Sequence, residues 1–315
     1  MGMKNKRPTI GLYLSGRLGN QFFRYAFARA IMEKQGEGDL ICNFSHLKKK
    51  GFENALKDFN VIPYKRDDSN LELKYGDIQQ KIQYLNYCVF FRAAGKFFKR
   101  KDTDVDEWYD KMTKYGIVYA IVQHGRKEYV FPDKKMLIMS GNFENSKYFN
   151  SIRHALLKEF TPKHPPLEHN RSLYEVINSG EAVCVTIRRG DYLNREYKKT
   201  LFLCDEEYFK KAIERIKALV ERPIFVFFSD DINWVKSQMR VDGYDCYYER
   251  GDDPVWEKLR LMYSCKHFII SNSTFSWWAQ YLSRNENKIV VSPSRWYNAS
   301  YQSPLIEDSF ITIDV

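Results

Sequence analysis

The second half of the chain alternates short apolar runs with helical segments, and this alternation constrains the fold more than any other feature of the sequence. The apolar runs cover residues 182–187, 224–228, 246–248, 267–270 and 289–292, and helical segments at 206–220, 231–240, 254–264 and 274–284 separate them. Buried strands that alternate with helices form a parallel sheet with helices on both faces. Residues 181–315 are therefore predicted to form a doubly wound α/β domain, in which ligands bind beyond the carboxyl ends of the strands.

The first half begins with the same order of elements. An apolar run at 10–15 ends in the turn Gly16-Arg-Leu-Gly19, and residues 20–34 place apolar side chains on one helical face. Further apolar runs predict strands at 40–44, 117–123 and 136–140. A strand, a tight loop and a helix are thus expected to open an N-terminal α/β domain.

The length of the chain predicts two domains. At 315 residues it is about twice the usual size of one domain, so we expect a cleft between two separate cores. The segment 161–180 contains three prolines and few large apolar residues, as linkers do. The predicted organisation is an N-terminal domain at 1–160, a linker at 161–180 and a C-terminal domain at 181–315. The final residues are expected to pack back on the N-terminal domain.

The charge and the aromatic content restrict the class of partner. A formal charge of +10 and a pI of about 9.1 favour an anionic partner, namely nucleotide phosphates, nucleic acid or an acidic lipid surface. Aromatic residues make up 16% of the chain. This content suits sugar binding, in which rings pack on the C–H faces of a sugar, and it equally suits a core rich in aromatic side chains.

Signals for several other classes are missing from the sequence. The apolar run near the basic N-terminus is too short for a signal peptide, and no apolar stretch reaches the roughly 18 residues of a membrane span. The six cysteines are scattered without a C-x-x-C pair, which indicates neither a zinc site nor disulfides. Asp104-Val-Asp106 has the spacing of a divalent-metal motif, but its lysine-rich setting predicts a solvated loop. We expect a cytoplasmic protein without a metal site.

Three polar clusters follow predicted strands of the C-terminal domain. The last of them, Ser271, Asn272, Ser273 and Thr274, directly precedes a helix. Hydroxyl groups and the unpaired N–H groups of a first helical turn can hold phosphate oxygens, so this cluster is a candidate diphosphate site. Simple N-capping of the helix is the alternative. The aromatic residues at 275–278 are expected to pack in the core behind it.

The other two clusters carry charge. Arg188 and Arg189 end a strand and point to opposite sides, and one of them can neutralise a departing diphosphate. The alternative is a structural ion pair with Asp191 or a nearby acid. In the second cluster, Ser229 and Asp230 can accept hydrogen bonds from a ribose or a base, while the adjacent aspartate is equally suited to cap the following helix.

The N-terminal turn supplies a fourth candidate. Gly16, Arg17 and Gly19 form a loop whose glycines let the backbone approach a ligand. Asn20 and Gln21 follow and offer amides to a sugar hydroxyl or a diphosphate. The pattern is neither a dinucleotide fingerprint nor a P-loop, and a plain turn is the alternative.

The ordered set of these segments resembles glycosyltransferase family 11, the α-1,2-fucosyltransferases of bacteria and animals. The matching segments are 16–26, 141–149, 187–192, 228–231, 261–282 and 293–296. The resemblance implies a GT-B-like fold of two Rossmann-like domains, GDP-β-L-fucose as donor, no required metal or other cofactor, and inversion to an α-linked fucoside. It places Arg188 or Arg189 on the donor phosphates, Ser271–Thr274 at the diphosphate region and Asn20 at the reacting centre.

An inverting transfer of this kind needs a base for the acceptor hydroxyl, and an arginine can replace a metal at the leaving group. Asp191 is the first candidate for the base and Glu196 the second. The chain departs from the family pattern in two places: Thr186 stands where a histidine is usual, and an aromatic-Gln-Ser-Glu pattern reads Phe143-Glu-Asn-Ser146. Both departures concern the acceptor and the linkage more than the donor.

The partners expected from this resemblance are GDP-fucose and a glycan acceptor of capsule, O-antigen or a free oligosaccharide. The basic aromatic segment 84–101 suits contact with the inner face of the plasma membrane, where lipid-linked acceptors lie, and packing on the N-terminal domain is the alternative. Two other functions remain open. One is a related transferase that uses another GDP-sugar or forms another fucosyl linkage, and the more distant one is a basic nucleic-acid-binding protein.

Overall fold

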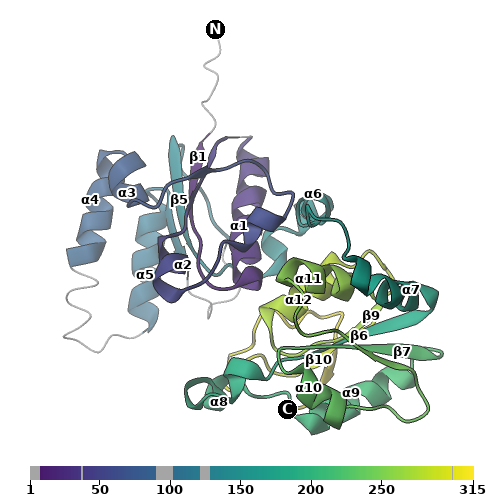
Figure 1. The fold of residues 1–315 in the computed structure, drawn as a ribbon. Helices are drawn as coiled ribbons and strands as arrows, with labels where there is room; N and C mark the ends of the chain where they lie inside the picture. The colour runs from purple at the N-terminus through teal and green to yellow at the C-terminus, as the bar shows by residue number, and fades with distance from the viewer. Residues whose placement is uncertain (1–7, 37, 90–101, 121–127, 300) are drawn as a thin grey trace. The chain divides into compact units, whose positions relative to one another are not determined.

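The computed structural model describes residues 8–36, 38–89, 102–120, 128–299 and 301–315, without the side chains of 102–106. The chain forms two compact units, one of residues up to Lys57 together with Val61–Leu156, and one of Asp58–Asn60 together with Leu157–Val315. Both are α/β units built on a parallel sheet (Figure 1). The predicted fold class and the two parallel sheets are confirmed, whereas the cleft between two domains stays a prediction.

The first unit contains a five-stranded parallel sheet in the order β3-β2-β1-β5-β4. Its strands are β1 (Thr9–Tyr13), β2 (Leu40–Asn43), β3 (Lys65–Arg66), β4 (Ile117–Ala120) and β5 (Met136–Gly141). In the register of the three central strands, Leu12 lies beside Cys42 and beside Met139. The predicted strands are present: β1 and β2 end before the predicted residues, β5 extends one residue further, and residues 121–123 lie outside the described part of the chain.

One long helix dominates the packing of the first unit. The helices are α1 (Leu18–Gln35), α2 (Ser45–Lys50), α3 (Leu71–Tyr75), α4 (Ile78–Asn86) and α5 (Asp102–Thr113), with short 3-10 turns at Ala55–Asp58, Ser146–Tyr148 and Asn150–Ile152. Phe22, Phe23 and Phe27 of α1 are buried almost completely. Because α1 follows β1 after a short loop, its first turn is carried to the carboxyl end of the sheet.

The second unit contains a six-stranded parallel sheet in the order β11-β10-β9-β6-β7-β8. Its strands are β6 (Glu181–Ile187), β7 (Pro223–Ser229), β8 (Cys246–Tyr248), β9 (His267–Ile269), β10 (Val290–Pro293) and β11 (Ile311–Ile313). This strand order is that of the dinucleotide-binding α/β fold, in which the order reverses between two central strands, here β6 and β9. A doubly wound C-terminal sheet was predicted and is confirmed.

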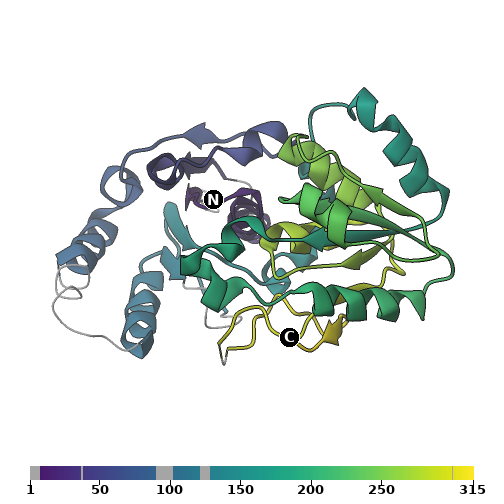
Figure 2. The ribbon, with the colours of Figure 1, turned by 60° about the horizontal axis from the view of Figure 1, so that its bottom comes forward.

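Helices cover both faces of the second sheet, as the two views show (Figures 1 and 2). They are α7 (Arg171–Ser179), α8 (Arg195–Leu201), α9 (Glu206–Lys217), α10 (Ile232–Gln238), α11 (Val255–Ser264) and α12 (Thr274–Leu282), and 3-10 turns lie at Glu168–Asn170 and Gly190–Leu193. Side chains of β6 pack with those of α9 and α10 in one continuous core. Trp277 and Trp278 of α12 are fully buried, which confirms the core position predicted for these two residues, whereas Phe275 is partly buried.

The segment expected to be a linker lies within the second unit, and the division of the chain falls inside α6 (Arg153–Glu159). Buried hydrogen bonds hold the segment there. Asn170 donates to Asp253 at 2.8 Å and to Glu257 at 3.2 Å, and Arg260 donates to the carbonyl oxygen of His164. Prolines and exposed polar residues resemble a linker in the sequence, but these long-range contacts fasten the segment to α11.

One further expectation differs from the structure. Residues 102–113 form α5, so Asp104-Val-Asp106 is helical and not a loop. Ile311–Ile313 form β11 beside β10 in the second unit, and packing of the final residues on the first unit stays a prediction. Of the segment 84–101, residues 90–101 lie outside the described part of the chain. Among the described residues, no helix has both the length and the apolar character needed to cross a membrane.

Candidate functional site

The three predicted polar clusters of the second unit follow neighbouring strands. Arg188 follows β6, Ser229 ends β7 and Ser271 comes shortly after β9, and β6 pairs with both other strands in parallel. The carboxyl ends of parallel strands meet at one edge of the sheet, so the topology places all three clusters at the edge where the strand order reverses. In open α/β sheets this is where ligands bind.

Arg188 lies between two carboxylates. Its Nη2 contacts Asp191 Oδ1 at 2.5 Å, and its Nη1 contacts Asp230 Oδ2 at 2.8 Å. The side chain remains 24% exposed, so part of its five-donor guanidinium can still face a ligand. The predicted alternative of a structural ion pair therefore describes the observed arrangement, and Asp191, the predicted base, is one of its partners.

Arg189 is held on the other side of the strand. Its guanidinium lies 3.4 Å from the centroid of the Trp234 ring, and its Nε donates to Asp231 Oδ2 at 3.3 Å. Its backbone N–H donates to Asp230 Oδ1 at 2.9 Å. Asp231 also accepts a hydrogen bond from the backbone N–H of Trp234 at 3.4 Å, so it caps α10. Stacking and capping identify Arg189 as the more structural of the two arginines.

Gly190 makes the approach of Asp230 possible. A Cβ atom at this position would lie 2.3 Å from Asp230 Oδ2, much closer than non-bonded atoms approach. Ser229 supports the same loop, because its hydroxyl accepts a hydrogen bond from the Asp231 backbone N–H at 3.0 Å. The glycine between the arginine pair and Asp191 is thus required by the packing of the neighbouring cluster.

The cluster before α12 divides into a buried and a partly exposed half. Ser271 and Asn272 are 1% and 2% exposed. Asn272 Nδ2 donates to the carbonyl oxygens of Leu201 and Trp296, both at 2.9 Å. The backbone carbonyl oxygen of Asn272 accepts a hydrogen bond from the Tyr192 hydroxyl at 2.9 Å. Asn272 therefore joins the loops around the site and has no amide N–H left to donate to a ligand.

Ser273 and Thr274 form the half of this cluster that remains partly exposed. Ser273 occupies the N-cap position of α12, yet its side chain makes no capping hydrogen bond. The alternative of simple capping therefore does not describe Ser273. With the first-turn N–H groups of α12, these two residues remain the phosphate-binding candidates of the cluster.

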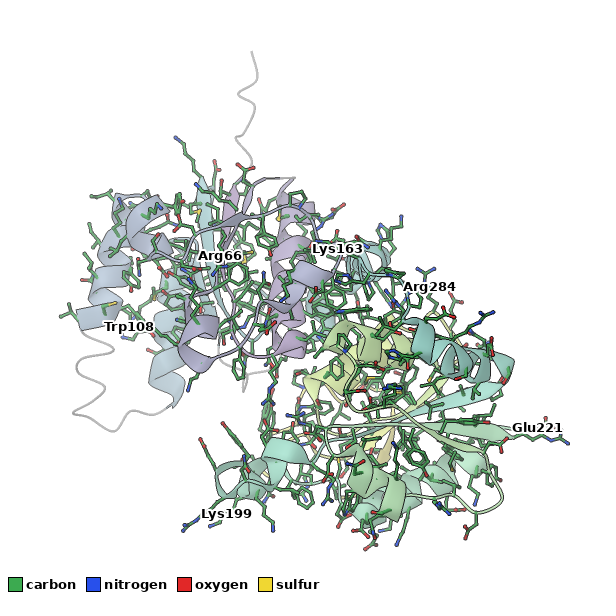
Figure 3. All side chains as sticks on the ribbon, viewed as in Figure 1. Arg66, Trp108, Lys163, Lys199, Glu221 and Arg284 are labelled. Atoms are coloured by element: carbon green, nitrogen blue, oxygen red, sulfur yellow. The ribbon has the colours of Figure 1, made fainter. Side chains whose placement is uncertain are left out.

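A cavity of about 480 Å³ opens beside Arg189 and Trp234. Ile187, Phe202, Cys204 and Phe209 supply apolar walls, and Glu206, Glu207 and Lys210 supply charge. Glu196, the second candidate for the base, is exposed on helix α8. Figure 3 shows Lys199 of the same helix extending away from the second unit.

The N-terminal loop is positioned by β1 and α1 of the first unit. Gly16 has φ +78°, a left-handed conformation that favours glycine, and Gly19 is buried in the first turn of α1. Arg17 occupies the N-cap position and its guanidinium lies 5.5 Å from the Phe52 ring centroid. The first turn of α1 carries no acidic residue, so its N–H groups retain their affinity for anions.

Gln21 is a structural residue, in contrast to the predicted ligand contact. Its Nε2 donates to the carbonyl oxygens of Gly16 and Glu53, both at 2.9 Å, and its Oε1 accepts from the Ala55 backbone N–H at 2.9 Å. The side chain is completely buried. Both N–H groups of the Gln21 amide therefore donate hydrogen bonds within the protein. Gln21 stabilises the loop, and its side chain has no N–H group left to donate to a ligand.

Two buried charged residues near this loop were missed by the sequence-based reasoning. Arg24 is 6% exposed and donates to the Tyr13 carbonyl at 3.1 Å and to Asn142 Oδ1 at 2.7 Å. Burial lowers the pKa of Arg24 to about 10, and the negative charge of Glu144 opposes the change. Glu144, also 6% exposed, accepts a hydrogen bond from Asn20 Nδ2 at 3.1 Å. The departure at Phe143-Glu-Asn-Ser146 was the one signal that pointed to this position.

No group of three or more His, Cys, Asp or Glu side chains in the described ranges is arranged to hold a metal ion. Independence from a metal stays a prediction. At the carboxyl edges of the two sheets, the positive groups are arginine side chains and the N-terminal turns of α1 and α12.

Comparison with known proteins agrees with this arrangement. The family described as Glycosyl transferase family 11 matches residues 96–312. The O-antigen biosynthesis glycosyltransferase WbnK of Escherichia coli is 26% identical over 95% of this chain and 99% of its own. An alpha-1,2-colitosyltransferase of Escherichia coli is 28% identical over 90% of this chain and 91% of its own.

A relative from an animal is similar over much of the chain as well. The galactoside 2-alpha-L-fucosyltransferase Sec1 of Mus musculus is 28% identical over 90% of this chain and 68% of its own. The family match spans the second sheet with its three polar clusters, and the three relatives cover 90–95% of the chain. The chain therefore belongs to glycosyl transferase family 11.

Proposed function

We propose that this glycosyltransferase moves L-fucose from GDP-β-L-fucose to a galactoside hydroxyl, with inversion and in an α-1,2 linkage, during the synthesis of a surface polysaccharide or oligosaccharide. The observation that carries the proposal is the grouping of Arg188, Ser273 and Thr274 at the carboxyl ends of β6 and β9. This edge combines a guanidinium with a helix N-terminus, and both favour a diphosphate. The similarity to a galactoside 2-alpha-L-fucosyltransferase supports the choice of sugar and acceptor, and the similarity to an alpha-1,2-colitosyltransferase supports the linkage.

The leaving diphosphate is stabilised by Arg188 and the first turn of α12. Three aspartates and two arginines leave this cluster without excess positive charge, so the diphosphate must replace a carboxylate on Arg188 to bind it well. Asp191, which contacts Arg188 at 2.5 Å, is the proposed partner that is displaced. Its carboxylate then becomes available to take the proton of the acceptor hydroxyl. Glu196 remains the second candidate, on the exposed helix α8.

The donor is bound without a metal ion in this proposal, because Arg188 and the first-turn backbone N–H groups of α12 supply the positive groups. Asp230 and Ser229 contact the ribose or the base. The same proposal includes a glycan acceptor, in free or lipid-linked form, and a cytoplasmic location. The expected substrate set is therefore GDP-fucose and a glycan that ends in galactose.

Incubation with GDP-fucose and a glycan array tests the activity, and NMR of the product determines the linkage. GDP is expected to compete with the donor much better than UDP, and excess EDTA is expected to leave the rate unchanged. A lack of transfer to any galactoside, together with equal competition by both nucleotides, would contradict the proposal. Salt-dependent binding to DNA or RNA without nucleotide-sugar binding would favour the distant alternative.

A related donor is the second candidate function. The similarity to an alpha-1,2-colitosyltransferase at 28% identity favours it. Colitose lacks one hydroxyl group of fucose, and a site that hydrogen-bonds this hydroxyl rejects the sugar without it strongly. Parallel assays with both nucleotide sugars distinguish the two donors, since the higher kcat/KM identifies the better substrate.

A further inference from the structure

The loop after β5 places Glu144 by means of an unusual backbone. Phe143 has φ +51°, in the left-handed region that side chains other than glycine rarely adopt. The backbone N–H of Asn145 donates to the Phe143 carbonyl at 2.9 Å, which closes a tight turn with Glu144 at its centre. The Phe143 ring stacks on Phe27 of α1 with centroids 3.9 Å apart and planes 7° apart. Such a backbone persists only where its surroundings hold it, and this stacking holds it.

The turn brings the Glu144 carboxylate to the first turns of α1. Asn20 Nδ2 donates to Glu144 Oε1 at 3.1 Å, although the two residues are 124 positions apart. Arg24 lies four residues after Asn20 and thus on the same helical face. Its buried guanidinium is favoured by the charge of Glu144 and is anchored by Asn142 from the same loop. The Glu144 carboxylate therefore orients Asn20 and also balances the positive charge of Arg24.

Asn20 is confined on its other side by Gly16. A Cβ atom on Gly16 would lie 2.8 Å from the Cβ of Asn20, so the loop backbone packs directly against this side chain. An ionised carboxylate only accepts hydrogen bonds. Asn20 must therefore turn its NH₂ group towards Glu144. The carbonyl oxygen of the same amide then points away from Glu144.

From this geometry we propose that Glu144 is a positioning residue that sets the orientation of the Asn20 amide for sugar transfer. The inference rests on the proposed function together with the family resemblance, which places Asn20 at the reacting centre. It also gives a physical meaning to the departure from the family pattern at this position. A glutamine can turn either its oxygen or its NH₂ group towards Asn20, whereas a glutamate admits one orientation.

A double-mutant cycle tests the inference with the full-length enzyme. Glu144→Ala, Glu144→Gln and Asn20→Ala are compared with the two double variants by kcat, KM for GDP-fucose and thermal midpoint. We expect Glu144→Ala to lower kcat at least about tenfold with less than about a twofold change in KM. Glu144→Gln keeps an acceptor oxygen and restores kcat to within about threefold of the wild type. In the Asn20→Ala background neither change at position 144 lowers kcat further.

The possible outcomes separate this inference from its alternatives. Equal losses from Glu144→Ala with and without Asn20 overturn it, because Glu144 then acts independently of Asn20. A Glu144→Gln variant as inactive as Glu144→Ala assigns proton transfer to Glu144 and overturns the positioning role. If Glu144→Ala does not fold, Glu144→Asp replaces it in the cycle, since it keeps the charge beside Arg24 and withdraws the carboxylate by one methylene. A wild-type enzyme that transfers no fucose contradicts the proposed function itself.

Discussion

The guanidinium of Arg189 lies 3.4 Å from the centroid of the Trp234 ring, on the opposite side of the strand from Arg188. Arg188 instead forms ion pairs with Asp191 and Asp230. Two adjacent residues of the same type thus have different surroundings. A guanidinium on an aromatic face stabilises the packing of α10, whereas a guanidinium between carboxylates at a strand end is available for ligand exchange.

Replacement of the two arginines is therefore expected to have different effects. Arg188→Ala should lower kcat at least about a hundredfold, equivalent to roughly 3 kcal/mol of transition-state stabilisation, with little change in thermal midpoint. Arg189→Ala should lower the free energy of unfolding by about 1–3 kcal/mol because it removes the stacking and the Asp231 contact. Kinetics and urea unfolding of both variants check this. Retained activity in Arg188→Ala would falsify its phosphate role.

Gly190→Ala tests the packing between the first two clusters. The added methyl group would lie 2.3 Å from Asp230 Oδ2, so Asp230 must move away from Arg188. We expect a loss of about 1–3 kcal/mol in the free energy of unfolding. Asp230→Ala provides the background in which the methyl group meets no carboxylate and costs little. The same loss in both backgrounds would show that the steric conflict lies elsewhere.

Gln21→Ala tests the structural assignment of the N-terminal loop. The substitution removes three hydrogen bonds to backbone groups of the loop and its surroundings, all of 2.9 Å. The expected loss in the free energy of unfolding is about 2–4 kcal/mol. Gln35→Ala is the matched control, since Gln35 is exposed at the end of the same helix and should change stability by less than about 0.5 kcal/mol. Similar urea midpoints for both variants would contradict the assignment.

The ion pairs at the start of β6 predict a pH dependence of stability. Hydrogen bonds from Lys266 and His267 hold the pKa of Glu181 below its ordinary value of 4.5. Because the folded-state pKa is lowered, the contribution of Glu181 is complete above pH 4.5 and is lost as the pH falls through the folded-state value.

Urea unfolding at about pH 7 and about pH 3 measures this contribution. Glu181→Gln should be less stable than the wild type at the higher pH, and the difference should shrink at the lower pH. Glu286→Gln is the control, because Glu286 is exposed and should give a small difference at both pH values. An unchanged difference between wild type and Glu181→Gln would show that the charge of Glu181 plays no part.

The sequence by itself determined the class of the fold and the edge of the sheet that carries the site. Alternating apolar runs and helical segments predicted the strands β6 to β10 and the helices α9 to α12, because hydrophobic periodicity is a local property of the chain, but they missed α8 and β11. The same pattern placed three polar clusters at strand ends and the aromatic run at 275–278 in the core. Family membership followed from the order of these segments.

Only the tertiary structure decided what each polar side chain does. Whether an amide binds a ligand or the protein depends on partners that are distant in the chain. Gln21 is occupied by Glu53 and Ala55, and Asn272 joins Leu201 to Trp296. Asn20 meets Glu144 across 124 positions. Buried polar groups must be satisfied by whatever the fold brings to them, and no local pattern records which residues those are.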